Sequence, residues 1–170
     1  GGNGGGGGNG GGGNVPAGGG ASYFNVKSYG AKADGKTDDA PAIKKAIAAA
    51  QDTNGGIVYL PAGLYLMNAG LDVPMGVSLR GETPSAPKKW RKIADLGTGS
   101  IPFEAAGSSW LAASNFSGTW ILVNHGAGNV DSHATFEVQG NASVYGLGFV
   151  HKDTAPAAAK ITVYPPAVAV

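Results

Sequence analysis

Short apolar segments separated by turn residues dominate the pattern from residue 57 to residue 81. The segments begin at Ile57, Leu64, Leu71 and Val77, and Pro, Asn or Gly residues interrupt them. Residues 57–77 therefore hold three short strands and three turns, which is about one coil of a β-solenoid with a period of 20–50 residues. Hairpins would need two-residue turns of the Asn-Gly type, so the pattern favours a coil.

The period changes to that of a helix just before these strands. Four apolar residues recur every three to four positions, which predicts one helix face: Ile43, Ala46, Ile47 and Ala50. Asp38 or Asp39 can cap the start of this helix, and residues 54–56 (Asn-Gly-Gly) end it. The small, alanine-rich face suits close packing against a flat surface.

Alternating segments return after a long interruption. Residues 82–119 contain prolines and no clear alternation, and we interpret them as an excursion from one turn of the coil. Strand patterns resume at 120–123, 135–139 and 144–149. Within the coils we expect Ile57, Tyr59, Val77 and Leu79 to point inward, and Glu137, between Phe136 and Val138, to point outward.

The two ends of the chain differ from its middle. Residues 1–20 hold 14 glycines and no charge, which predicts a flexible tether, with a polyglycine helix as the alternative. The domain itself is then residues 21–170. The chain ends on the apolar, strand-like residues 161–170 without a cap, so we expect the natural protein to continue beyond Val170. An open terminal coil could also pair with another copy of itself.

Composition limits the functional classes. The net charge of +1 gives no support for nucleic-acid or membrane-surface binding, and no apolar stretch predicts membrane insertion. Only 14% of residues are charged, so Ser, Thr, Asn and Gly must form much of the surface. The absence of cysteine excludes thiolate catalysis and cysteine-based zinc sites, and no cofactor is indicated by the composition.

Three segments resemble a known family. Residues 24–39 (FNVKSYGAKADGKTDD), 55–65 (GGIVYLPAGLY) and 77–81 (VSLRG) are similar to the opening signature of the pectate lyase superfamily. The segment 136–149 is similar to a later coil. These are single-stranded right-handed parallel β-helix proteins related to family 28 glycoside hydrolases. The resemblance implies an all-β solenoid whose N-terminal coils are closed by one capping α-helix. Ala33 stands where glycine is usual, a minor departure.

The resemblance implies function only broadly, because polygalacturonases, β-1,3-glucanases, lyases, epimerases and phage tailspikes share this opening. We expect the N-terminal part of an extracellular or cell-surface protein that cleaves or binds a polysaccharide. The reaction would be hydrolysis by paired carboxylates or β-elimination beside Ca²⁺ if the parent is lyase-like. Family active sites generally lie in later coils, so this chain alone should be inactive. The alternative is a non-catalytic structural or adhesive module of the tail-fibre or surface-protein type.

Five residues are candidates for substrate binding. Asp131 and His133, with His125 nearby, could form a carboxylate–imidazole pair, although a polar loop leaving a coil is the plainer interpretation. Glu137 could line a sugar groove, and with Asp131 or Asp153 it could form a glycosidase pair. The catalytic residues themselves stay unassigned.

The tryptophans complete the candidates. Trp90 and Trp110 lie in the excursion, where they could stack on sugar rings, and basic residues at 88–92 could grip an acidic polysaccharide. A solvated loop is the plainer interpretation of that segment. Trp120 begins an apolar strand and is predicted to be core. We assign the acidic group Asp34, Asp38 and Asp39 to turn formation and helix capping, with a catalytic or Ca²⁺ role as the alternative.

Overall fold

The computed structural model describes residues 22–85, 113–129, 131–151 and 166–170. Several sequence predictions fall outside the described residues: the tether, Trp90, Trp110, the basic residues at 88–92 and Asp153. Within these described ranges the helices are α1 (Ala40–Asp52) and two short 3-10 turns, Val26–Tyr29 and Ala113–Asn115. The strands are β1 (Tyr23–Asn25), β2 (Asp34–Asp38), β3 (Gly56–Leu60), β4 (Gly63–Met67), β5 (Leu71–Val73), β6 (Val77–Gly81), β7 (Thr119–Val123), β8 (Phe136–Val138), β9 (Ser143–Tyr145), β10 (Leu147–His151) and β11 (Val168–Ala169).

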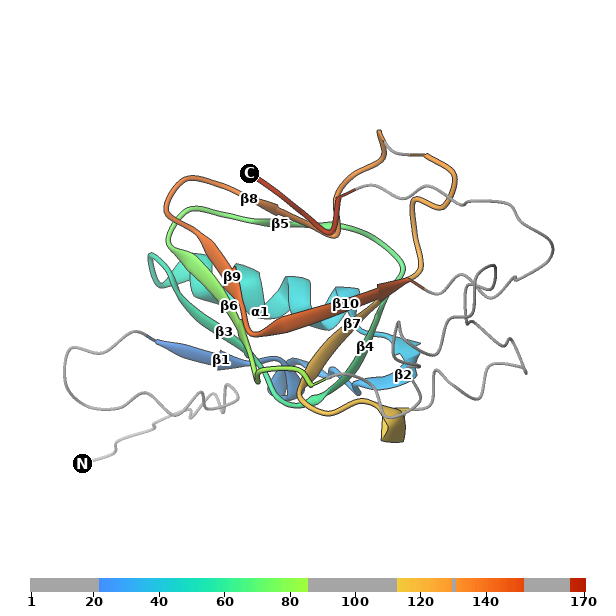
Figure 1. The fold of residues 1–170 in the computed structure, drawn as a ribbon. Helices are drawn as coiled ribbons and strands as arrows, with labels where there is room; N and C mark the ends of the chain where they lie inside the picture. The colour runs from blue at the N-terminus through green and yellow to red at the C-terminus, as the bar shows by residue number, and fades with distance from the viewer. Residues whose placement is uncertain (1–21, 86–112, 130, 152–165) are drawn as a thin grey trace, which may run out of the picture.

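In the described part of the chain these strands form three parallel sheets (Figure 1). Sheet A has the order β1-β3-β6-β9, sheet B β10-β7-β4-β2, and sheet C β11-β8-β5. The chain visits sheet A, then B, then C, and repeats: β3, β4 and β5 are followed by β6, β7 and β8. Every strand pairs in parallel with the strand one coil away. This topology confirms the predicted parallel β-helix.

The interior of the coils is a stack of apolar side chains. In sheet A the buried Val58 pairs with Leu79, which pairs with Val144 in the next coil. The expectation for Val77 and Leu79 is confirmed, but Ile57 and Tyr59 do not point inward. They are half-buried, while Val58 and Leu60 of the same strand are fully buried. Residues 57–60 are all apolar, so alternation could not fix which set faces the core.

Helix α1 closes the N-terminal end of the stack, as the sequence predicts. Its predicted apolar face is buried against the core. The Oδ1 of Asp38 accepts the N–H of Ala40 at 3.1 Å. The buried Asp39 is the N-cap residue, but its carboxylate instead accepts the backbone N–H groups of Lys32 and Ala33 at 2.6 and 3.0 Å. Burial raises the pKa of Asp39 above its ordinary value.

Local hydrogen bonds also fix the end of α1 and the turn that precedes α1 in the chain. The N–H of Gly55 donates to the carbonyl of Ala50 at 2.9 Å, and Asn54 and Gly55 both adopt positive φ. Before α1, one Asp34 oxygen accepts the N–H groups of Lys36 and Thr37. The acidic group is thus occupied by backbone hydrogen bonds. Among the described residues, no helix has the length and apolar character that spanning a membrane requires.

Candidate functional site

Two carboxylates lie side by side on the outer face of sheet C. In the β5–β8 pair, Asp72 is the register partner of Glu137, and the flanking Leu71 and Phe136 are also partners. Leu71 and Phe136 are buried, so Asp72 and Glu137 project to the opposite, outer side. The prediction that Glu137 points outward is therefore confirmed. A parallel ladder places the two acids at neighbouring positions of successive coils.

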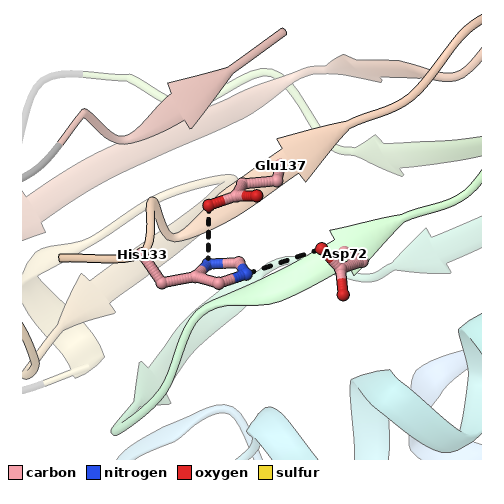
Figure 2. Close-up of side chains that lie close together, drawn as sticks. All are labelled: Asp72, His133 and Glu137. Atoms are coloured by element: carbon pink, nitrogen blue, oxygen red, sulfur yellow. Dashed lines mark ion pairs between the residues drawn. The ribbon is translucent and has the colours of Figure 1, made fainter. Parts of the chain in front are cut away.

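His133 joins these two acids from the loop before β8 (Figure 2). Its Nε2 lies 3.5 Å from Oδ1 of Asp72, and its Nδ1 lies 3.3 Å from Oε1 of Glu137. We call these three side chains the His133 cluster. They are open to solvent, because the side chains of His133 and Asp72 are 43% and 62% exposed.

The backbone fixes the orientation of the His133 ring. Nδ1 lies 2.7 Å from the carbonyl oxygen of Ala134. A carbonyl oxygen only accepts hydrogen bonds, so Nδ1 must carry the proton. This hydrogen bond to Ala134, together with the charges of Glu137 and Asp72, raises the pKa of His133 above its ordinary value, against a smaller opposing effect of burial.

A glycine lets the His133 loop lie on β5. A Cβ on Gly70 would overlap both the carbonyl oxygen of Ala134 and Nδ1 of His133. The adjacent Leu71 N–H donates to the carbonyl of Thr135 at 3.0 Å, which fixes the loop over the start of β5. The close approach of two backbones therefore requires the smallest residue at position 70.

The other sequence candidates are placed differently. The ring of His133 faces Asp72 and Glu137, whereas the backbone N–H of Asp131 donates to Oδ1 of Asn129 in the preceding turn. His125 is separate: its Nε2 lies 3.3 Å from Oγ1 of Thr135, and burial lowers its pKa. Sequence reasoning missed Asp72. It is polar between Leu71 and Val73, the same alternating signal that identified Glu137.

Trp120 is part of the core, which confirms the prediction. Its side chain is almost completely buried beside Phe116, with ring centroids 5.4 Å apart in an edge-on arrangement. Its indole N–H donates to the carbonyl of Ser117 at 3.0 Å. A tryptophan buried in this way has no face free for a sugar.

The His133 cluster can bind polar ligands in two ways. Each of its three side chains offers one atom that can ligate a metal, and these atoms lie within 4.8 Å of one another, a spacing that can hold a cation. Ca²⁺ takes about six to eight oxygen ligands, whereas this cluster offers two carboxylates and one imidazole nitrogen, so it does not fit a calcium site. With both ring nitrogens facing acceptors, the geometry suits an imidazolium that orients the two carboxylates toward the hydroxyl groups of a ligand.

A parallel β-helix closed at its N-terminal end by a helix is the fold of pectate lyase-like proteins. The chain belongs to the family described as rhamnogalacturonase A/epimerase, pectate lyase-like, which matches residues 23–120. This membership confirms the resemblance seen in the sequence.

Curated relatives share a short segment with this chain. Alginate lyase 7 of Azotobacter vinelandii is 57% identical over 47 residues, which is 28% of this chain and 6% of that protein. Mannuronan C5-epimerase AlgE3 of the same organism is 58% identical over 45 residues, 26% of this chain and 2% of the relative. The matched part is therefore less than a tenth of the length of either relative.

Solved structures similar to this chain cover more of it. The A-module of the Azotobacter vinelandii mannuronan C-5 epimerase AlgE6 has a TM-score of 0.37 and 24% identity, and the match covers 78% of this chain and 34% of that one. ORF18 of Geobacillus virus E2 has the same TM-score and 26% identity, covering 78% of this chain and 18% of the viral one.

Proposed function

We propose that this chain is the capped N-terminal part of a polysaccharide-modifying β-helix protein and that the outer face of sheet C contacts the polymer. The observation that carries the proposal is the His133 cluster, an exposed set of hydrogen-bonding groups at matched positions of successive coils. Family membership supports it, and so do the names of relatives that act on alginate and mannuronan. The substrate class that follows is a uronate polysaccharide.

The chemistry of the cluster suits recognition of a sugar chain. The carboxylates of Asp72 and Glu137 accept hydrogen bonds from hydroxyl groups, and a protonated His133 holds the two carboxylates in place through its ring nitrogens. Bond cleavage or epimerisation is assigned to further coils of the parent protein. The chain then supplies the cap and part of the polymer-binding face, at an extracellular or cell-surface location.

An array binding assay of the full 170-residue chain tests the proposal. The probes are alginate, polymannuronate, polygalacturonate and neutral glucans, each with and without Ca²⁺. We expect selective binding to uronate polymers, and we expect Asp72→Asn together with Glu137→Gln to weaken it by about tenfold, as loss of two charged hydrogen-bond acceptors predicts. The matched control is Asp52→Asn, an exposed acid at the end of α1.

Two results would contradict the proposal. The first is a folded chain, verified by circular dichroism, that binds none of the polymers; a non-catalytic structural module would then be the better description. The second is a chain that binds uronate polymers with the same affinity whether it carries the Asp72 and Glu137 double substitution or the Asp52 control substitution. That result would remove the His133 cluster from the polymer site.

A further inference from the structure

Sheet A carries a second outward set of side chains, away from the His133 cluster. Tyr59 of β3, Arg80 of β6 and Tyr145 of β9 are register partners across three successive strands. Their neighbours Val58 and Leu79 are buried, so these three side chains point to the outside. Together with Tyr23 of β1, they form what we call the tyrosine–arginine ladder.

The members of the ladder contact one another. The rings of Tyr23 and Tyr59 are tilted, with centroids 6.1 Å apart. Nη1 of Arg80 donates to the hydroxyl of Tyr23 at 3.1 Å, and the guanidinium carbon of Arg80 lies 5.5 Å from the ring centroid of Tyr145. These contacts join side chains from β1, β3, β6 and β9 into one continuous surface that runs across the strands.

Only part of this surface is explained by the stability of the fold. The hydroxyl of Tyr59 donates to Oε1 of Glu82 at 2.7 Å, and the same oxygen accepts the N–H of Ala62, so Tyr59 helps to fix a turn. Tyr23 and Tyr145 are 36% and 45% exposed, although both are large aromatic residues. Exposed aromatic rings gathered on the outside of a sheet are typical of binding surfaces.

The charge of Arg80 is also available. Within residues 22–85, 113–129, 131–151 and 166–170, no carboxylate forms an ion pair with it. Its guanidinium has five N–H donors, of which the bond to Tyr23 uses one. The remaining donors match a carboxylate, and the two flanking tyrosines match the apolar faces of sugar rings.

We propose that the tyrosine–arginine ladder is a second docking surface for a uronate chain, separate from the outer face of sheet C. The register partners Tyr59, Arg80 and Tyr145 follow one another about every 4.8 Å along the solenoid axis, so a polymer lying along this axis meets one of them at each strand. Tyr23 and Tyr145 contact sugar rings, and Arg80 pairs with a uronate carboxylate. This inference rests on the proposed function, because both need the chain to bind an acidic polysaccharide.

Single substitutions in the full chain test the ladder. Tyr145→Ser removes an exposed ring, and Arg80→Gln removes the charge. Met75→Ala, at a highly exposed position, and Lys45→Gln, on the exposed side of α1, are the matched controls. Calorimetric titration with mannuronate and galacturonate oligomers, and with a neutral glucan oligomer of equal length, gives the dissociation constants. We expect each ladder variant to bind uronate oligomers about tenfold more weakly, with controls unchanged.

The outcomes separate this inference from the proposed function. If ladder variants bind uronates like the wild type while the Asp72 and Glu137 variant loses binding, the ladder is not a docking surface and the proposed function stands. Equal affinity of the wild type for the neutral oligomer would overturn the pairing of Arg80 with a carboxylate. Wild-type chain that binds no oligomer overturns both. Circular dichroism melting curves that match the wild type show that a weakened variant is folded.

Discussion

The outer faces of sheets B and C have the same coil geometry, but one is covered and apolar and the other is exposed and polar. On sheet B the outward residues are apolar and covered: Leu66, Leu122 and Val150 are register partners and all are buried. Phe116 packs against this outer cluster. On sheet C the equivalent outward positions hold Asp72 and Glu137, which are open to solvent. The backbone ladder is the same, so the outward side chains, and the segment around Phe116 that packs on sheet B, decide whether a face is covered or can bind a ligand.

The difference is visible strand by strand. All five residues of β7 are buried, as in parallel strands with both faces covered. In β5 only the two residues that face the core are buried, and Asp72 between them is exposed. A covered face contributes to stability through its apolar area, whereas an exposed polar face contributes little. Substitutions on sheets B and C should therefore separate stability from ligand binding.

The largest expected effect is on the covered face. Leu122→Ala leaves a cavity at a fully buried position, and we expect the free energy of unfolding to fall by about 2–5 kcal/mol. Equilibrium denaturation in urea, followed by circular dichroism, measures this change. Glu137→Ala on sheet C is the comparison, with an expected change within about 0.5 kcal/mol. A loss for Leu122→Ala that is as small as the loss for Glu137→Ala would mean that the outer face of sheet B is not a core layer.

A smaller effect is expected where the His133 loop meets β5. Gly70→Ala forces a Cβ into the space of the Ala134 carbonyl, so the loop must shift, and we expect a loss of about 1–3 kcal/mol from overpacking. The shift should also bring the pKa of His133 closer to its ordinary value. Urea denaturation and a proton NMR titration measure the two effects. The exposed Ala69→Ser is the control. A variant with wild-type stability and titration would show that residues 70 and 134 are not in close contact.

The smallest effect is on the pH dependence of stability, where the pKa shifts of two histidines have opposite signs. The pKa of His133 is raised, so its stabilising contribution is complete below the ordinary value of 6.5 and is lost as pH rises through the native pKa. The pKa of His125 is lowered, so its contribution is present above 6.5 and is lost as pH falls toward the native pKa. NMR titration of both imidazoles should give values on either side of 6.5.

Substitution of the acids sharpens the pH measurement. Glu137→Gln removes one of the charges that favour the protonated ring, so the pKa of His133 should fall while that of His125 stays nearly constant. A titration of His133 that is unchanged in this variant would show that the charge of Glu137 does not act on the imidazole.

Local sequence patterns predicted the capping helix and most coil strands, but they missed β2 and the break that separates β9 from β10. The spacing of Ile43 and Ile47 predicted α1, and short apolar runs broken by turns predicted the coils. The alternation of Phe136, Glu137 and Val138 placed Glu137 outside. These features depend on residues that lie close together in the sequence, so a local pattern is enough to predict them.

The site needed the tertiary structure. Residues 57–60 are uniformly apolar, and only the pairing of β3 with β6 decided that Val58 faces the core and Tyr59 faces out. Asp72 and His133 belong to different coils, and no local pattern relates them. The sequence by itself determined the capped coils of the chain. The stacking register decided which side chains meet, because contacts between coils depend on three-dimensional pairing that a linear period does not contain.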